Sequence, residues 1–192
     1  DGAMVPFRIF ETFGKPQVYA ALAAIAVGIA KEMNLVDISE ALSRYRAPAG
    51  RLRLLEGIKQ SLIVDDSYNA SPAAMHAAMD LIRDFYESSG KDGRRARRIA
   101  VLGDMLELGG FTEKAHRAVG QNLRGIDILM TSGARAKFIA DEARMNGFPL
   151  DKIFEFSESG EAASALKKMI EPGDLVLVKG SLAMRMVKIT KA

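Results

Sequence analysis

The stretches Ile99-Ala100-Val101-Leu102 and Leu175-Val176-Leu177-Val178 decide the fold. Each is an unbroken apolar run of strand length, and such runs are typical of parallel strands that helices cover on both faces. The alternation of strands and helices around them predicts an α/β fold, an open, mostly parallel, Rossmann-like sheet with helices on both faces. The further strands are expected at 126–131 and 152–156, and the helices at 112–123, 134–145 and 158–170.

The region before this alternation is expected to extend the sheet. Leu52 to Glu56 and Leu62 to Asp65 are predicted to be strands in a hairpin-like pair. A helix is predicted from Pro72 to Tyr86, because Ser71 is a good N-cap and proline is tolerated at the first helical position.

The first fifty residues differ from the rest because they predict mainly helices. A short strand is expected at 5–10 and helices at 16–33 and 36–45, before the chain breaks at Ala47-Pro48-Ala49-Gly50. Such a segment is too small to hold a core of its own. We therefore expect residues 1–49 to be the tail of a domain whose body lies outside this sequence, and residues 50–192 to form a second domain. The apolar stripe of the first helix would then be exposed, which predicts self-association or partial disorder.

Composition limits the class of protein. The 192 residues include no cysteine, which excludes a disulfide framework and a thiolate metal site. The N-terminus lacks a signal-peptide pattern, and the longest nearly uncharged run, 16–30, is too short to span a bilayer. These features predict a cytoplasmic protein with no membrane partner. The basic run from Arg94 to Arg98 lacks interleaved aromatic residues, so it predicts a solvated loop and no nucleic-acid partner.

Candidate sites follow the strands, because ligands of such sheets bind beyond the carboxyl ends of the strands. The first candidate is Asp65-Asp66-Ser67-Tyr68-Asn69-Ala70-Ser71. Successive strand residues point to opposite faces, and we expect Asp66 to face the cleft as an acceptor for hydroxyl groups. The alternative is that these polar residues only form a turn and cap a helix.

Two further segments follow strands. Leu102 to Gly110 forms a glycine-bounded loop that allows close backbone approach to a ligand, but it does not match G-x-G-x-x-G, which disfavours a dinucleotide-binding dehydrogenase. Lys179, Ser181 and Arg185 could together hold a carboxylate or phosphate. Lys179 could instead be only the polar end of a strand.

Other signals of chemistry are weak. His76 and His116 have no cysteine or second histidine at ligand spacing, so we expect ordinary helix residues and no metal site. No catalytic residue is assigned. The phosphate-binding pattern G-x-x-x-x-G-K-[ST] does not occur, so an ATP-dependent enzyme would need more protein than this chain.

Three segments taken together resemble C-terminal motifs of the Mur ligase family, in the branch that adds D-alanyl-D-alanine to a peptidoglycan precursor. They are Asp-Asp-Ser-Tyr-Asn-Ala-Ser-Pro at 65–72, Val-Leu-Gly-Asp-Met-Leu-Glu-Leu-Gly at 101–109 and Val-Lys-Gly-Ser at 178–181. Gly50-Arg51 resembles the family's junction between a central ATP-binding domain and a C-terminal domain. The resemblance implies an ATP-dependent ligase in which a peptide carboxylate becomes an acyl phosphate that an amine attacks, with closure of the C-terminal domain excluding water.

The same resemblance implies partners, cofactors and site residues. The partners would be D-alanyl-D-alanine, UDP-N-acetylmuramoyl-tripeptide and the missing N-terminal and central domains. ATP and Mg²⁺ would serve the full-length enzyme, with neither bound by this chain alone, which should be inactive. Arg51 would reach the nucleotide phosphates and Asp66 the ribose hydroxyls. The D-alanyl-D-alanine pocket would be lined or supported by Asn69, Ala70, Ser71, Asp104, Glu107, Lys179, Ser181 and Arg185.

Some positions depart from the family pattern. Where the family usually has His-Asn and a further Asn three residues on, this chain has Pro16, Gln17 and Ala20. In the family, the two asparagines help to hold adenine. Leu182 stands where a basic residue is common. These departures keep open a divergent, non-catalytic binding module that retains the fold. A related ligase such as folylpolyglutamate synthase is a further alternative, although we would not expect it to carry both the 67–72 and 102–109 motifs.

Overall fold

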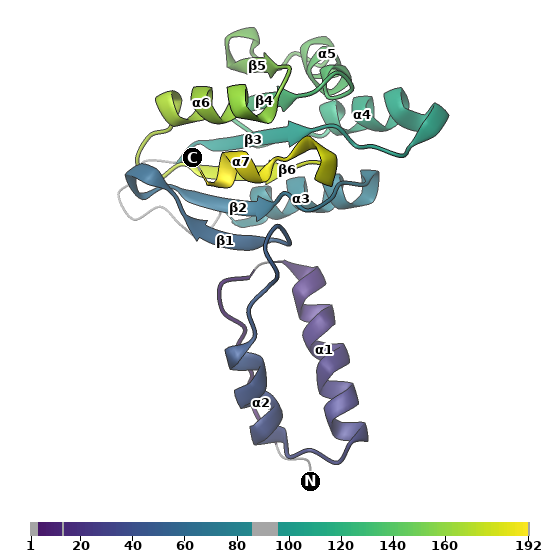
Figure 1. Cartoon of the computed structure of the whole chain (residues 1–192), viewed down its shortest axis with the longest axis vertical. Helices are drawn as coiled ribbons and strands as arrows, with labels where there is room; N and C mark the ends of the chain where they lie inside the picture. Colours follow the sequence, from purple (N-terminus) through teal and green to yellow (C-terminus); the bar gives the residue numbers. More distant parts are fainter. Residues whose placement is uncertain (1–3, 13, 86–95, 192) are drawn as a thin grey trace.

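The computed structural model describes residues 4–12, 14–85 and 96–191. Within them, six strands form one sheet in the order β1-β2-β6-β3-β4-β5 (Figure 1). Neighbouring strands are parallel except β1 and β2, which are antiparallel, so the predicted mostly parallel sheet and hairpin-like pair are confirmed. The strands are β1 (Arg53–Glu56), β2 (Leu62–Asp66), β3 (Arg98–Gly103), β4 (Ile128–Ser132), β5 (Ile153–Phe156) and β6 (Leu175–Lys179).

The two apolar runs that decide the fold lie side by side in the centre of the sheet. Strands β3 and β6 pair with Ile99 opposite Val176, and every residue of both strands is buried. This burial follows from the continuous apolar sequence, because a parallel strand inside a doubly covered sheet exposes neither of its faces to water.

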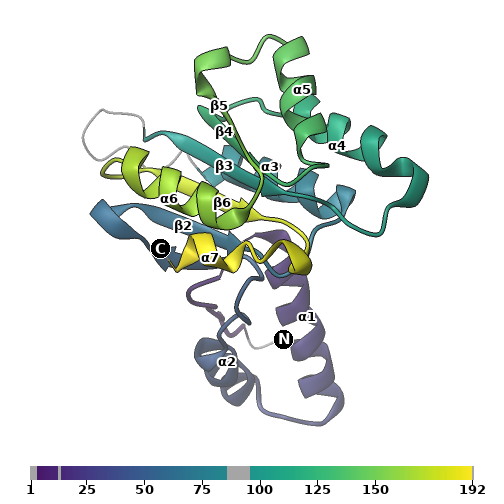
Figure 2. The same ribbon diagram turned by 45° about the horizontal axis from the view of Figure 1, so that its top comes forward.

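Helices cover both faces of the sheet, as expected (Figure 2). Helices α3, α4 and α5 pack on the face that carries Leu177, and α6 and α7 pack on the face that carries Val178. These two residues are neighbours in β6, so the pleat sends them to opposite cores. The helices of this region are α3 (Pro72–Phe85), α4 (Thr112–Gln121), α5 (Lys137–Met145), α6 (Ser159–Met169) and α7 (Val187–Thr190), with short 3-10 turns at Ile58–Gln60, Gly109–Phe111, Leu150–Lys152 and Leu182–Met184.

Helices α1 (Lys15–Ala30) and α2 (Leu35–Arg44) project from the β1 edge of the sheet (Figure 1). They share a small apolar cluster, separate from the two cores on the sheet. The strand predicted at 5–10 is wrong, because these residues are not in a strand and Phe7 and Ile9 pack against this cluster. Thr12, just after them, forms an isolated bridge with Arg53 of β1. Across the described parts of the chain, no helix is both long and apolar enough to cross a membrane.

The prediction of a solvated loop for the basic run 94–98 is wrong for Arg97 and Arg98, which lie in its described part. The Arg97 guanidinium donates two hydrogen bonds to Asp174, at 2.7 and 3.0 Å, and Arg98 is buried at the start of β3 with its backbone N–H on Asp127. Hydrogen bonding to Asp174 raises the pKa of Arg97 above its ordinary value. Arg94 and Arg95 lie outside the described residues.

Candidate functional site

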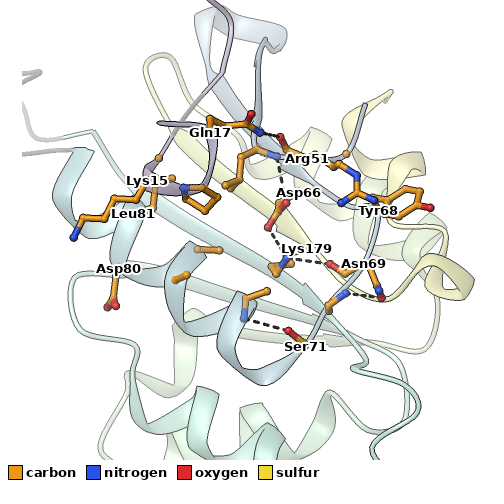
Figure 3. Close-up of a pocket in the computed structure, with 18 of the residues that line it drawn as sticks. Lys15, Gln17, Arg51, Asp66, Tyr68, Asn69, Ser71, Asp80, Leu81 and Lys179 are labelled. Carbon is orange, nitrogen blue, oxygen red and sulfur yellow. Dashed lines mark hydrogen bonds and ion pairs between the residues drawn. The ribbon is translucent and has the colours of Figure 1, made fainter. Parts of the chain in front are cut away.

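A cavity of about 690 Å³ lies where β2 and β6 end, between the start of α1 and one side of α3 (Figure 3). Its volume is within the range of pockets that hold a small molecule or cofactor, roughly 300–1,000 Å³. The walls come from residues 14–17 and 50–52, from Asp66 and residues 68–71, from one side of α3, and from Lys179. The cavity therefore joins the two segments that the sequence assigns to different domains.

An ion pair between the buried Lys179 and the partly buried Asp66 forms the floor of this cavity. Asp66 and Lys179 are register partners in the parallel strands β2 and β6, and the Asp66 carboxylate pairs with the Lys179 ammonium. The other carboxylate oxygen accepts from the backbone N–H of Leu52 at 3.2 Å, and the ammonium also donates to the Asn69 carbonyl at 3.0 Å. The predicted orientation of Asp66 towards the cleft agrees with this placement, whereas the pairing of Lys179 with Asp66 was not predicted.

Asp65 points to the other side of β2 and has a structural role. Its carboxylate accepts from the backbone N–H groups of Gly50, at 3.1 Å, and Ser67, at 3.2 Å. Gly50 has a φ of 75°, and a Cβ there would lie 2.7 Å from the backbone nitrogen of Tyr68, so only glycine fits without strain. Asp65 and Gly50 thus anchor the segment that carries Arg51.

Arg51 lies at the mouth of the cavity on an aromatic support. Its guanidinium carbon is 4.2 Å from the centre of the Tyr68 ring, and both side chains line the cavity. The Arg51 carbonyl accepts from the Gln17 side chain at 3.0 Å. This arrangement presents a cation to the cavity while its backbone is held in place.

The turn after β2 fits both interpretations that the sequence left open, since it caps a helix and also lines the cavity. Ser71 lines the cavity, and its hydroxyl also accepts from the backbone N–H of Ala74 at 3.3 Å, which confirms the predicted cap of α3. Asn69 accepts from the backbone N–H of Ala70 at 2.8 Å through its side-chain oxygen. The segment is therefore a turn and helix cap that also forms the wall of the cavity.

Four of the predicted site residues are not among those that line the cavity: Asp104, Glu107, Ser181 and Arg185. The buried Asp104 carboxylate accepts from the backbone N–H groups that precede α5, at 2.7 and 3.0 Å. The Ser181 hydroxyl accepts from the backbone N–H of Leu106 at 2.9 Å. Glu107 and Arg185 are exposed and have positive φ angles of 64° and 50°. The predicted residues therefore form two groups, one in the cavity and one in the loops that follow β3 and β6.

His116 has a more specific role than the sequence predicted. Its ring is fully buried; Nε2 accepts from the backbone N–H of Met105 at 2.9 Å, and Nδ1 lies 2.6 Å from the Thr112 carbonyl, to which it donates in the neutral tautomer. Burial lowers the pKa of His116 below its ordinary value, and the bond to Thr112 partly opposes this effect. The spacing of Thr112 and His116 on one helix face could have indicated their bond, whereas the contact with Met105 depends on the fold.

The described residues contain no group of three or more His, Cys, Asp or Glu side chains placed to hold a metal ion. The prediction that this chain binds no metal by itself stays a prediction.

The mostly parallel sheet, with a cavity at the carboxyl ends of β2 and β6 that contains a few charged side chains, defines an α/β ligand-binding domain. The chain belongs to the Mur ligase family, since residues 50–182 match the family model described as "Mur ligase, glutamate ligase domain". This match begins at Gly50, where the sequence predicts a domain boundary.

Similar proteins cover nearly the whole chain. The UDP-N-acetylmuramoyl-tripeptide–D-alanyl-D-alanine ligase of Bacillus subtilis is 35% identical over 93% of this chain and 38% of its own length. The Escherichia coli ligase of the same name is 28% identical over 93% of this chain and 37% of its own length. The crystal structure of MurF ligase from Thermotoga maritima in complex with ADP superposes with a TM-score of 0.72 and 24% identity, over 94% of this chain and 38% of that one. The chain thus spans less than two fifths of the length of these proteins.

Proposed function

We propose that this chain is the C-terminal part of an ATP-dependent ligase that adds D-alanyl-D-alanine to UDP-N-acetylmuramoyl-tripeptide in the synthesis of peptidoglycan precursors. The observation that carries the proposal is the cavity in which Arg51, Asp66 and Lys179 of the family domain face residues 14–17 of the preceding segment. Relatives with this activity in their names match more than nine tenths of the chain. Residues 1–49 would be the tail of the central domain, and residues 50–192 the C-terminal domain.

The cavity suits a nucleotide. Arg51 offers a guanidinium for the phosphates, because its five donors match phosphate oxygens and the Tyr68 ring supports it. Asp66 would accept from the ribose hydroxyls, since a carboxylate has about four acceptor positions and two of those on Asp66 are used. ATP supplies the phosphoryl group that activates the peptide carboxylate. We assign the binding of Mg²⁺ to the nucleotide phosphates and to the rest of the ligase, and we place the enzyme in the cytoplasm, where ATP is available.

The amino substrate would bind beside the nucleotide. Asn69, Ala70 and Ser71 line the same cavity as Arg51. Asp104, Glu107, Ser181 and Arg185 would contribute from the loops after β3 and β6, mostly by holding those loops in shape. Closure of this domain over the rest of the ligase would exclude water from the acyl phosphate.

The decisive experiment measures ADP release by the longer ligase, which includes the phosphate loop. ADP should form only when ATP, UDP-N-acetylmuramoyl-tripeptide and D-alanyl-D-alanine are all present. L-glutamate in place of D-alanyl-D-alanine is the matched control, and turnover with a folate and L-glutamate would support the folylpolyglutamate synthase alternative. No ADP with the three named substrates would contradict the proposal.

A second candidate function is a non-catalytic binding module. Gln17 and Ala20 stand where the family pattern has asparagines that help to hold adenine. Gln17 lines the cavity beside Pro16, and its side-chain amide is already bonded to the Arg51 carbonyl. Replacing Gln17 and Ala20 with Asn in the longer protein tests this alternative. A gain in ATP affinity would indicate a weakened but working site, and no change would indicate a vestigial one.

A further inference from the structure

Lys179 is a lysine in the interior of the sheet, where this residue type is rarely found without a partner. Strand β6 lies between β2 and β3, and the Lys179 side chain is only 3% exposed. Its ammonium contacts the Asp66 carboxylate and the Asn69 carbonyl. Two of its three donor positions therefore already have partners within the protein.

The pairing with Asp66 makes Lys179 a poor site for a substrate carboxylate. The two side chains carry opposite charges and are both largely removed from solvent, with Asp66 13% exposed. An incoming anion would meet a neutral pair, and to reach the ammonium it would have to displace a carboxylate that is already desolvated. Separating such a pair leaves a charge without compensation, which is strongly unfavourable.

The contacts of Lys179 instead connect three parts of the cavity wall. Asp66, which it holds, also accepts from the backbone N–H of Leu52, the residue after Arg51. The Asn69 carbonyl, which it also holds, belongs to the turn that leads to Ser71 and the start of α3. One ammonium thus links the segment that carries Arg51, the end of β2 and the turn before α3 (Figure 3).

We propose that Lys179 is a positioning residue for the nucleotide: it fixes Asp66 and the Asn69 turn, and it does not contact the amino substrate. This inference rests on the proposed function and deepens it, because it moves Lys179 from the D-alanyl-D-alanine pocket to the support of the nucleotide wall.

The test uses the longer ligase and the variant Lys179→Met, which keeps a long side chain without the charge. The KM for ATP should rise between about tenfold and about 100-fold, as expected when hydrogen bonds to a charged group are weakened or lost. The KM for D-alanyl-D-alanine should change less than about twofold, because the side chains of Asn69 and Ser71 keep their own bonds to the backbone N–H groups of Ala70 and Ala74, which do not involve Lys179. The matched control is Lys188→Met, at an exposed lysine of α7, which should leave both constants unchanged.

A double-mutant cycle with Asp66→Asn separates an indirect role from a direct one. If Lys179 acts through Asp66, adding Lys179→Met to Asp66→Asn should raise the KM for ATP by much less than the same change does alone. If Lys179 instead binds the substrate carboxylate, Lys179→Met would raise the KM for D-alanyl-D-alanine to the same extent in both backgrounds. The second result would overturn the inference.

The double-mutant cycle also gives a result if the single variant Lys179→Met does not fold. Lys179→Met leaves the partly buried Asp66 carboxylate uncompensated, whereas the pair Asp66→Asn and Lys179→Met removes both charges. If only the double variant folds, a raised KM for ATP with an unchanged KM for D-alanyl-D-alanine supports the inference, and the reverse overturns it. An unmodified ligase that forms no ADP would overturn the proposed function and this inference together. If the unmodified ligase is active but the variant raises the KM for D-alanyl-D-alanine and leaves the KM for ATP unchanged, only the inference is overturned.

Discussion

At the residue scale, Arg51 depends on its neighbour for its place in the cavity. The guanidinium lies 4.2 Å from the centre of the Tyr68 ring, which is itself 43% exposed. A cation over an aromatic ring at an exposed site gains about 0.5–1 kcal/mol. Since Tyr68 belongs to the turn after β2, this contact ties the direction of Arg51 to the same segment that holds Asp66 and Asn69.

Replacing Tyr68 with Leu should weaken nucleotide binding by the longer ligase about two- to fivefold, the equivalent of losing the cation–π contact. Tyr68→Phe keeps the ring and is the control, with an affinity close to that of the unmodified protein. Calorimetric titration with ADP measures both. Equal weakening by the two variants would show that the hydroxyl, and not the ring, supports the site.

His116 should make the stability of the chain depend on pH. Burial lowers the pKa of the folded-state imidazole below its ordinary value of 6.5, so the unfolded chain takes up a proton first as the pH falls. The free energy of unfolding should therefore be at its full value above about pH 6.5 and decrease as the pH falls from there towards the folded-state pKa. Urea unfolding at pH 7.5 and 5.5 measures this difference. His116→Gln, whose side-chain oxygen can still accept from Met105, should reduce the difference, and an unchanged difference in this variant would contradict the role of His116.

The sequence predicts the direction of a side chain where that direction depends only on the local backbone conformation. Strand alternation correctly turns Asp66 to the cavity and Asp65 away from it. The pairing of Lys179 with Asp66 and the contact of His116 with Met105 could not be predicted, because they depend on the register of β2 on β6 and on the loop after β3. The roles of the predicted site residues stay predictions.

At the scale of elements, α3 begins inside the candidate site, so its cap and the cavity share a residue. The Ser71 hydroxyl accepts from the backbone N–H of Ala74 and also faces the cavity. Ser71→Ala should lower the free energy of unfolding by about 1 kcal/mol, the usual value of an N-cap. Ser71→Asp keeps a capping oxygen and should retain most of that stability while placing a carboxylate in the cavity. Chemical denaturation measures both variants, and an unchanged midpoint for Ser71→Ala would contradict the capping role.

Helices and strands could be predicted where the apolar residues follow one clear periodicity along the sequence. The continuous apolar runs of β3 and β6 and the capped start of α3 appear where expected. The segment 5–10 alternates like a strand, but in the described parts of the chain it pairs with no strand, and it packs on α1 and α2 instead. The short helix α7 was not predicted, because four residues at 187–190 carry too little periodic signal.

At the scale of the whole molecule, α1 presents an apolar surface without a partner in the described chain. Val18, Leu22 and Ile29, spaced to lie on one side of the helix, are 47%, 48% and 54% exposed. Only Ala21 and Gly28 of this helix are buried. Gly28 allows the close packing of α2, since a Cβ there would lie 2.7 Å from Ile38. An exposed stripe of this kind is typical of an interface.

This surface predicts that the 192-residue chain associates with itself in solution. Sedimentation velocity should show an average sedimentation coefficient that rises with protein concentration. The reason is that burying apolar surface between two copies of the chain stabilises their contact by about 25 cal/mol per Å² of buried area. Replacing Val18, Leu22 and Ile29 with Gln should abolish the rise, since Gln keeps the helix but removes the apolar stripe. Leu150→Gln removes an equally apolar side chain that is 71% exposed and far along the chain, and it should leave the rise unchanged. A chain that stays monomeric at every concentration would contradict the prediction, and equal effects of both changes would place the contact elsewhere than on α1.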